Sequence, residues 1–310
     1  MKIGFIGLGN VGSKLAGSLL RNGFDLSVFD LNSQLLEKFA SKGAEIGEDP
    51  ANLMHLCDLV ITCLPSPAAS NSVMQLMLPF VKEGKTWLEM STTDDAEVRR
   101  LGAEVISRGG KAVDCPVSGG CHRANTGNIS IFAGCDRATF EIILPLLTTM
   151  GRRVLHTGEL GSASILKVIT NFLATANLVS CAEALTVAKA AGLDLRNSYE
   201  AIRISSGNSF VHETESQVIL NGSYNINFTM DLVLKDTGLF DELAKKLNAP
   251  LEISPKIVEI FKDGQKKYGS RAWSSMIVKR MEDLNNINFR ANGFPDELID
   301  NEPEEKGYEI

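Results

Sequence analysis

The sequence predicts an α/β fold in which an amino-terminal, doubly wound, mostly parallel sheet is followed by an all-α domain. Over the first 150 residues, short apolar runs alternate with amphipathic helical patterns, which is typical of a parallel sheet covered on both faces. A glycine-rich loop follows the first apolar run directly. Beyond residue 162 the apolar runs give way to helical patterns, so the second part of the chain is expected to contain no sheet.

The elements of the first domain follow from these patterns. Six apolar runs are the expected strands, namely Lys2–Ile6, Leu26–Phe29, Leu59–Cys63, Thr86–Glu89, Ala112–Asp114 and Ser130–Ala133. Five amphipathic stretches are the expected helices between them, namely Val11–Asn22, Ser33–Lys42, Ser70–Val81, Asp95–Arg108 and Asp136–Met150.

A long helix is expected over Ala163–Ala191, which contains neither Gly nor Pro and would span roughly 44 Å at about 1.5 Å per residue. It is apolar almost all round, so we expect most of its faces to be buried. A membrane span is the competing interpretation, but polar and charged side chains interrupt the helix and disfavour it. These are Lys167, Asn171, Asn177, Glu183 and Lys189.

The patterns divide the chain into residues 1–162, a helical domain of residues 163–285, and an acidic segment of residues 286–310 that is expected to be flexible and to carry no core. The whole chain has 31 basic and 38 acidic residues, a net charge of −7. Residues 296–310 hold seven acids and one base, which makes −6 of that total. With no basic excess, nucleic acid is not an expected partner.

The six cysteines form no CxxC pair and share no zinc-site spacing with histidine, so we expect reduced thiols and no metal site. The sequence opens directly on an apolar strand, without the features of a secretory signal. A cytoplasmic location and no membrane association are therefore expected.

The loop Gly7-Leu8-Gly9-Asn10-Val11-Gly12 matches GxGxxG between a strand and a helix, the context in which the motif binds a dinucleotide and marks a Rossmann domain. Gly7 permits the tight turn, Gly9 leaves room for a pyrophosphate, and Gly12 lets helix and strand pack closely. The amino terminus of the following helix offers N–H groups to the phosphates.

Asp30 ends the next expected strand, where its carboxylate would accept hydrogen bonds from a ribose diol and repel a 2′-phosphate. No Arg follows it closely, so we expect NAD rather than NADP as the cofactor. Asp30 as a simple helix cap is the alternative. Further expected cofactor contacts lie where two later strands end, at Leu64 and Pro65 and at Ser91 and Thr92, although plain turns would use the same residues.

The segment Asp114-Cys115-Pro116-Val117-Ser118-Gly119-Gly120 follows another strand, and its Ser-Gly-Gly end exposes successive N–H groups that suit a carboxylate. A tight turn explains the same residues equally well. Lys167 and Asn171 lie four residues apart, on one face of the long helix. Either they form a structural hydrogen-bonded pair, or Lys167 exchanges a substrate proton while Asn171 orients the substrate.

A third group is Phe228-Thr229-Met230-Asp231-Leu232-Val233-Leu234-Lys235-Asp236, in which Lys235 is a candidate neighbour of the nicotinamide or the substrate and Asp236 would orient it. With these motifs in this order, the chain resembles the β-hydroxyacid dehydrogenase family, which includes 3-hydroxyisobutyrate dehydrogenase and tartronate semialdehyde reductase. FIGLGNVG, DCPVSGG, Gly158-x-x-Gly161 with Lys167 and Asn171, and FTMDLVLKD carry the resemblance, which covers about residues 1–285.

The resemblance implies a Rossmann domain joined by the long helix to a helical domain that helps subunits associate as a homodimer or homotetramer. It implies Lys167 as the catalytic acid/base. Ser118, Gly119, Gly120 and Asn171 would bind the substrate carboxylate, and Lys235 would lie near the nicotinamide with Phe228 beside it.

Two positions depart from the family pattern. Ala163 stands where the family commonly has Gly, and Cys121-His122-Arg123 is bulkier and more cationic than is usual after the substrate loop. Arg123 is therefore a candidate for binding a second anionic or polar group of the substrate, with a surface basic pair as the alternative.

The expected function is hydride transfer between NAD and a small β-hydroxy acid or its semialdehyde, of the 3-hydroxyisobutyrate or 2-hydroxy-3-oxopropanoate kind. A phosphogluconate-type decarboxylating dehydrogenase and an imine reductase relative are the enzymatic alternatives. A dinucleotide-binding scaffold or sensor without turnover is the alternative from another class.

Overall fold

The computed structural model describes residues 1–310, which divide into two compact units. The first unit contains Met1–Lys167 together with Asp300–Ile310, and the second contains Val168–Ile299. The boundary therefore lies inside the long helix, five residues beyond the expected end of the first domain at residue 162, and the chain returns to the first unit at its carboxyl end.

The first unit is built on a ten-stranded sheet with the strand order β10-β9-β8-β6-β5-β4-β1-β2-β3, and β7 pairs with β8 beside this path. Its strands are β1 Lys2–Ile6, β2 Asp25–Phe29, β3 Glu45–Ile46, β4 Leu59–Thr62, β5 Thr86–Glu89, β6 Lys111–Asp114, β7 Val117–Ser118, β8 Ile129–Gly134, β9 Gly151–Gly158 and β10 Tyr308–Glu309. The pairs are parallel except β6–β8 and β7–β8. The order 3-2-1-4-5-6 around β1 is that of a doubly wound dinucleotide-binding sheet.

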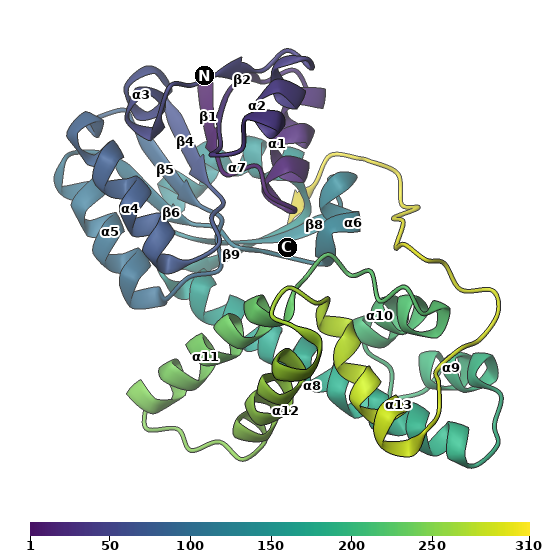
Figure 1. Cartoon of the computed structure of the whole chain (residues 1–310). Coiled ribbons are helices and arrows are strands. Elements are labelled where there is room, and N and C mark those ends of the chain that lie inside the picture. Colours follow the sequence, from purple (N-terminus) through teal and green to yellow (C-terminus); the bar gives the residue numbers. More distant parts are fainter. The chain divides into compact units, whose positions relative to one another are not determined.

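Helices cover both faces of this sheet (Figure 1). They are α1 Gly12–Arg21, α2 Ser33–Ala40, α3 Pro50–Leu56, α4 Pro67–Met77, α5 Asp95–Ser107, α6 Gly120–Asn125 and α7 Arg137–Met150, with a 3-10 turn at Leu78–Phe80. One buried cluster joins Phe5 of β1 to α1, α2 and α7, and another joins Ile6 to α3, α4 and α5. Neighbouring residues of one strand thus point into different layers.

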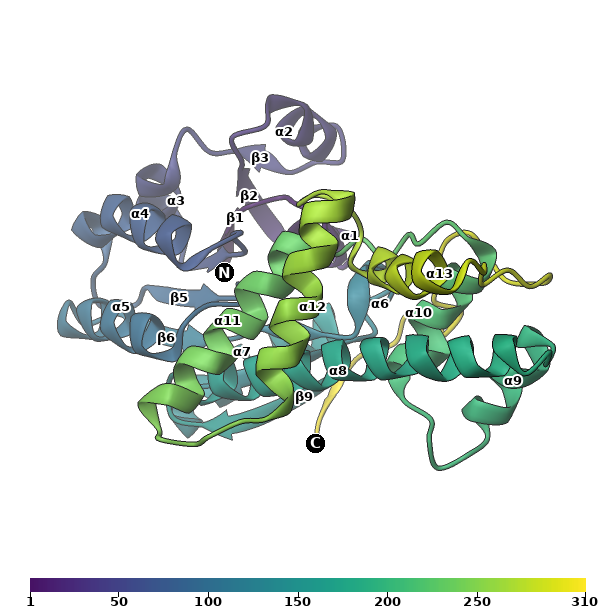
Figure 2. The ribbon, with the colours of Figure 1, turned by 60° about the horizontal axis from the view of Figure 1, so that its bottom comes forward.

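The second unit is helical, as expected. It contains most of α8 Ser162–Ala190, followed by α9 Leu195–Arg203, α10 Phe210–Asn221, α11 Met230–Lys246, α12 Ile253–Tyr268, a 3-10 turn at Ser274–Val278 and α13 Lys279–Asn285. Helices α11 and α12 pack side by side (Figure 2). Leu185, Phe261 and Phe289 are among its fully buried residues, so the core of this unit extends beyond the last helix.

Helix α8 is long and apolar enough to cross a membrane by length and composition alone, with 28% of its most apolar window buried. Core helices of globular domains meet the same criteria. In this chain Leu178, Ala182 and Leu185 of α8 lie in the core of the second unit.

The acidic segment of residues 286–310 differs from the expectation of a flexible tail without a core. Phe289 packs in the second unit. Residues 300–310 pack on the first unit, where β10 extends the sheet by pairing with β9, with Tyr308 beside Arg153 and Glu309 beside Val154. An excess of acids is typical of a solvated tail, but most of these acids form ion pairs with arginines of the first unit.

Candidate functional site

The glycine-rich loop connects β1 to α1, and its three glycines occupy three different environments. Gly7 has a φ of +96°, and a Cβ on it would lie 2.3 Å from the carbonyl oxygen of Cys63. A Cβ on Gly12 would lie 2.1 Å from the carbonyl oxygen of Gly7. A Cβ on Gly9 would have no heavy atom within 4 Å. Gly7 and Gly12 therefore pack the loop, whereas Gly9 borders open space.

The amino terminus of α1 faces this loop. No side chain of its cap residue caps it, and its first turn contains no acidic residue, so the helix supplies no negative charge at its own positive end. This arrangement, with the open space at Gly9, fits the pyrophosphate of a dinucleotide. The intervening residues Leu8, Asn10 and Val11 belong to the same loop.

Asp30 lies where β2 ends and is tied to the glycine-rich loop. Its Oδ2 accepts a hydrogen bond from the backbone N–H of Leu8 at 2.6 Å, and its Oδ1 accepts one from the N–H of Asn32 at 2.8 Å. Asn32, not Asp30, caps α2 through the N–H of Gln34. The helix-cap explanation of Asp30 is therefore wrong, and its carboxylate is held beside the loop with lone pairs left to accept further bonds.

Leu64 and Ser91 connect the loops after β4 and β5. The hydroxyl of Ser91 accepts a hydrogen bond from the N–H of Leu64 at 2.7 Å, and the N–H of Ser91 donates to Oε1 of Glu89 at 2.8 Å. Ser91 is buried, whereas Pro65 is exposed and Thr92 half-buried. Ser91 thus holds the two loops together. Because β1, β2, β4 and β5 are parallel neighbours, the structure gathers the loops at the ends of these strands on one edge of the sheet.

The substrate loop predicted at Ser118, Gly119 and Gly120 connects β7 to α6. Gly119 and Gly120 have φ values of +126° and +87°, a left-handed backbone that residues with a side chain rarely adopt. Both are accessible to solvent. The two glycines therefore form a turn without side-chain cover of their own, which is the feature on which the prediction of an anion-binding loop depends.

His122 and Arg123 follow on α6. Burial lowers the pKa of His122, and the positive charge of Arg123 lowers it further, so the imidazole is predominantly neutral at pH 7. The guanidinium of Arg123 pairs with Glu302 of the carboxyl-terminal segment at 3.2 Å. The candidate cation of the substrate loop is thus in contact with an acid from the end of the same chain.

Lys167 is the last residue of the first unit and lies in the second turn of α8, where it is 8% exposed. The turn before it is fixed by Asp114 at the end of β6. The carboxylate of Asp114 accepts hydrogen bonds from the N–H of Ser164 at 2.7 Å and from its hydroxyl at 2.8 Å. This buried cap connects the strand that leads into the substrate loop with the helix that carries Lys167.

Asn171 is bound in the second unit by a residue of α11. Its Nδ2 donates to Oδ2 of Asp236 at 2.5 Å, while Oδ1 of Asp236 pairs with Nζ of Lys235 at 3.0 Å. Asp236 is 3% exposed. One buried carboxylate therefore holds both predicted residues. The sequence predicts a contact of Asp236 with Lys235 alone, because the pairing of α11 with α8 has no signal in the linear sequence.

Aromatic packing lies next to this cluster. Phe172 and Phe240 stack with ring centroids 4.4 Å apart and planes 6° apart, which joins α8 to α11 beside Asn171. Phe228 precedes α11 and packs partly buried against the core, and its carbonyl accepts the N–H of Ser274 at 2.8 Å. The structure brings Asn171 and Lys235 together on Asp236 and places Phe228 in the segment just before α11, seven residues ahead of Lys235.

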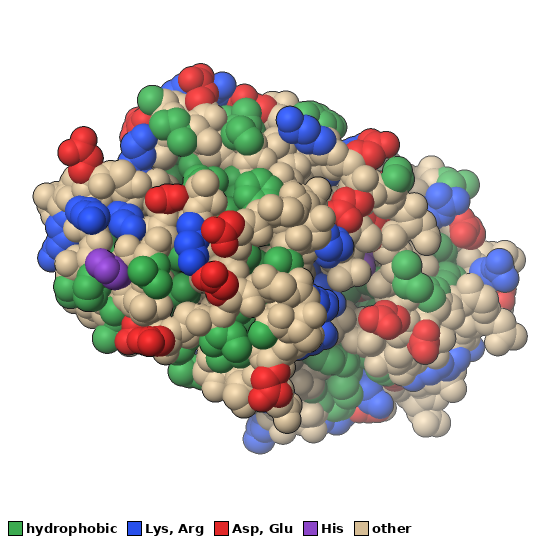
Figure 3. All heavy atoms as spheres, turned by 90° about the horizontal axis from the view of Figure 1, so that it is seen from above, with side chains coloured by type: hydrophobic (Ala, Val, Ile, Leu, Met, Phe, Trp, Pro, Cys, Tyr) green, Lys and Arg blue, Asp and Glu red, His purple; other side chains and the backbone are tan.

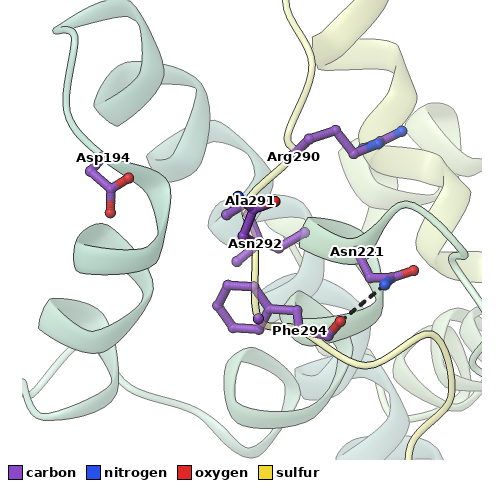
Figure 4. A pocket seen from close by; sticks show the side chains of 8 residues that line it. Asp194, Asn221, Arg290, Ala291, Asn292 and Phe294 are labelled. Carbon is purple, nitrogen blue, oxygen red and sulfur yellow. Dashed lines mark hydrogen bonds between the residues drawn. The ribbon is translucent and has the colours of Figure 1, made fainter.

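A pocket of about 400 Å³ in the second unit is separate from these residues (Figure 4). Its polar groups have partners within the chain: the amide of Asn221 donates to the carbonyl of Phe294 at 3.0 Å, and Arg290 bonds to Glu282 and Tyr224. Asp194, also in its lining, caps α9. We assign this pocket no role in the site.

No cluster of three His, Cys, Asp or Glu side chains suited to a metal ion occurs in the structure, and all six cysteines are free thiols. The face seen in Figure 3 shows acidic, basic and apolar side chains interspersed. Near the ends of the strands the structure offers backbone N–H groups, the carboxylates of Asp30, Glu89 and Asp114, and the buried Lys167.

Two family models match the chain and together cover most of it. Residues 2–158 match the NAD binding domain of 6-phosphogluconate dehydrogenase. Residues 161–281 match the NAD-binding domain of NADP-dependent 3-hydroxyisobutyrate dehydrogenase. The boundary between these matches, near residue 160, falls just before α8.

Curated relatives match over most of the chain. 2-(Hydroxymethyl)glutarate dehydrogenase of Eubacterium barkeri is 32% identical over 93% of this chain and 97% of its own length. Mitochondrial 3-hydroxyisobutyrate dehydrogenase of Rattus norvegicus is 30% identical over 88% of this chain and 85% of its own length. The cytokine-like nuclear factor N-PAC of Homo sapiens is 29% identical, but this chain spans only 48% of it.

Solved structures share the fold. 3-Hydroxyisobutyrate dehydrogenase from Salmonella typhimurium has a TM-score of 0.81 and 26% identity, over 90% of this chain and 99% of that one. Psf3, solved in complex with NADP+ and 2-OPP, has a TM-score of 0.81 and 22% identity over the same shares of the two chains. Both likenesses extend through the two units.

Proposed function

The chain belongs to the β-hydroxyacid dehydrogenase family and is an NAD(P)-dependent dehydrogenase acting on the CH–OH group of a hydroxy acid. From this premise we propose that it transfers a hydride between NAD and the alcohol carbon of a small β-hydroxy acid, or the reverse with the semialdehyde. A substrate like 3-hydroxyisobutyrate or 2-hydroxy-3-oxopropanoate is the proposed class. The cluster in which Asp236 holds both Asn171 and Lys235 carries this proposal.

The dinucleotide would be held by the glycine-rich loop, with its pyrophosphate against Gly9 and the amino terminus of α1. Leu64, Pro65 and Thr92, from the loops on the same edge of the sheet, would complete the contacts in the first unit. Phe228 and Lys235 are the proposed contacts from the second unit. When bound, the nicotinamide supplies the hydride acceptor or donor of the reaction.

The carboxylate of Asp30 supports NAD over NADP as the cofactor. It is anchored by two backbone N–H groups and cannot swing away without losing both. A 2′-phosphate placed beside it would meet a fixed negative charge, whereas a ribose diol would donate hydrogen bonds to it.

Lys167 is the proposed general acid/base. In the direction of oxidation its neutral amine accepts the hydroxyl proton while the hydride leaves the same carbon, and in reduction the ammonium returns that proton to the carbonyl oxygen. The cap on Ser164 fixes the turn of α8 before Lys167, which limits the positions its Nζ can take.

The substrate carboxylate is proposed to bind the backbone N–H groups at Ser118, Gly119 and Gly120. The side chain of Asn171 would orient it, because Asp236 takes one amide hydrogen and leaves the Oδ1 acceptor and the other hydrogen for the substrate. Arg123 would add a cation for substrates with a second anionic group. A homodimer or homotetramer is the proposed assembly.

Lys167→Ala tests this proposal. We expect kcat to fall by at least about a thousandfold, since a general acid/base contributes roughly 10² to 10⁴ and its positioning contributes more. The dissociation constant for NAD, measured by quenching of protein fluorescence, should stay within about twofold of wild type. The matched control is Lys189→Ala, which removes a lysine from the last turn of the same helix and should leave both quantities unchanged.

Retained turnover in Lys167→Ala would exclude the acid/base role. Equal loss in both variants would mean that charge on α8, not a specific proton transfer, matters. Binding of NAD by a wild-type protein that oxidises no hydroxy acid would instead favour the scaffold alternative.

A further inference from the structure

The last eleven residues, Asp300–Ile310, form a segment that we call the carboxyl-terminal strap. It lies on the first unit, although the 132 residues before it form the second. The second family model ends at residue 281, so the strap lies beyond the part of the chain that the model describes. Its acids contact basic or polar groups of the first unit along its whole length.

The beginning of the strap binds the loop that follows α6. The carboxylate of Asp300 accepts hydrogen bonds from the hydroxyl of Thr126 and from Nδ2 of Asn128, the latter at 2.7 Å. The same Nδ2 donates to the carbonyl of Glu302 at 3.0 Å. Asn128 is 3% exposed and these bonds are partly buried, so they are partly shielded from water, which strengthens hydrogen bonds to a carboxylate.

The next part of the strap binds α6 itself and its neighbour α1. The carboxylate of Glu302 pairs with Arg123 on α6 at 3.2 Å. Glu304 pairs with Arg21 on α1 at 3.0 Å, and Arg21 in turn donates to the carbonyl of Asn125, the last residue of α6, at 2.9 Å. The carboxyl-terminal half of α6 is therefore held from two directions.

The end of the strap is anchored on other elements, β9 and α7. Glu305 pairs with Arg152, and Glu309 pairs with Arg137 on α7, while β10 pairs with β9. The N–H of Gly307 donates to the carbonyl of Thr148 at 2.8 Å. These contacts fix the strap without touching α6.

Helix α6 contains only six residues and begins at Gly120, with Gly119 directly before it, so its orientation affects the backbone of both glycines, whereas Ser118 is held in β7 by its pairing with β8. A helix this short is not stable by itself, and tertiary contacts must hold it. We propose that the strap is a positioning element for substrate binding, in which Asp300 and Glu302 hold α6 and thereby set the backbone N–H groups that bind the substrate carboxylate. This inference rests on the proposed function of that loop.

Two double variants with the same change in charge test the proposal. Asp300→Ala with Glu302→Ala removes the contacts to α6 and its loop, and Glu305→Ala with Glu309→Ala removes the anchors on β9 and α7. The Asp300→Ala, Glu302→Ala variant should raise KM for the hydroxy acid by about tenfold, because the backbone N–H groups that bind the substrate lose their fixed positions. The dissociation constant for NAD should not change. The second pair should change KM by less than about twofold.

Hydrogen exchange gives a readout that does not depend on activity. Amides of residues 119–127 should exchange faster in the first double variant and at the wild-type rate in the second. Asp300→Asn should restore most of what Asp300→Ala loses, since one amide oxygen can accept from both Thr126 and Asn128. Melting temperatures identify any variant whose whole fold is weakened.

Unchanged exchange at residues 119–127, or an equal rise of KM in the two double variants, would overturn the strap's role. A strap variant with faster exchange in a protein whose wild type oxidises no hydroxy acid would support the positioning of α6 and would contradict the proposed function of the loop alone.

Discussion

Asp236 is the residue on which two other predicted site residues depend. It is almost fully buried, and its two oxygens are shared between the amide of Asn171 and the ammonium of Lys235. A buried carboxylate of this kind needs its partners, and they need it, because each would otherwise keep a desolvated polar group unpaired.

Removal of this carboxylate should therefore affect stability and catalysis together. Asp236→Ala is expected to lower the free energy of unfolding by about 2–4 kcal/mol. The amide of Asn171 loses its hydrogen-bond acceptor, whereas the ammonium of Lys235 is partly exposed and can still be hydrated. Chemical denaturation measures this change, and kcat should fall in the same variant. Glu242→Ala, at an exposed position of the same helix, should cost no more than about 0.5 kcal/mol. Equal effects of the two substitutions would contradict the role of Asp236.

At this scale the sequence predicts the glycine-rich loop, Asp30 and Lys167 because local spacing and a strand–loop–helix context determine them. It does not predict that Asp236 reaches Asn171, 65 residues away, or that Ser91 bonds to Leu64. Such pairs depend on which helices and loops become neighbours.

Gly9, in the loop before α1, and Gly17, within α1, have surroundings that differ enough to separate binding from folding. Gly9 borders open space, so Gly9→Ala should leave the free energy of unfolding within about 1 kcal/mol of wild type. The added methyl group would occupy the space left for the pyrophosphate, and the dissociation constant for NAD should rise by about tenfold or more. Isothermal titration calorimetry measures the binding.

Gly17→Ala is the control in the helix that follows the loop, where the new Cβ would meet only Arg21 at an ordinary 3.5 Å. It should raise stability by about 0.5–1 kcal/mol and leave NAD binding unchanged. If Gly9→Ala bound NAD as tightly as Gly17→Ala, the dinucleotide would not occupy this loop.

The cap between β6 and α8 makes stability depend on pH. The pKa of Asp114 is raised to about 6, mainly because the carboxyl group is buried. The hydrogen bonds from Ser164 lower this pKa, and the negative charge of the nearby Glu89 raises it. Between pH 4 and 6 the folded protein thus holds a proton that the unfolded chain releases, so this group's contribution to stability is largest below pH 4 and is lost as the pH rises through 6.

Asp114→Asn removes this titration. The free energy of unfolding of wild type minus that of the variant should therefore decrease from pH 4 to pH 7 by up to about 3 kcal/mol, at roughly 1.4 kcal/mol per pKa unit. Urea denaturation at four pH values measures it. A difference that stays constant, or that increases with pH, would show that Asp114 does not carry the raised pKa.

Among the elements, the long helix and the major strands are predictable because their periodicity extends over many residues. The structure adds β3, β7 and β10, each of two residues, and the helices α3 and α6 of seven and six residues. Such short elements contain less than two periods of any pattern. Strand β9, Gly151–Gly158, also lacks clear alternation, and its place beside β8 arises from the sheet itself.

At the scale of the whole molecule, the sequence predicts two consecutive domains followed by a flexible tail. The structure has two units instead, and the last eleven residues, the strap, belong to the first of them. The excess of acids at the carboxyl end indicates solvation when it is read alone. In the fold, however, the acids of the strap are bound to the first unit. Each of four arginines pairs with one of these acids, and the arginines are spread over 132 residues of the chain: Arg21, Arg123, Arg137 and Arg152. No local pattern connects these positions.

We propose above all that this chain oxidises a small β-hydroxy acid with NAD. The most direct test incubates the wild-type protein with 3-hydroxyisobutyrate, related β-hydroxy acids and 6-phosphogluconate, each with NAD and with NADP, and follows the absorbance of the reduced nicotinamide. We expect turnover of at least one small β-hydroxy acid and a larger kcat/KM with NAD than with NADP. Reduction with 6-phosphogluconate alone, a preference for NADP, or no turnover with any acid would contradict it.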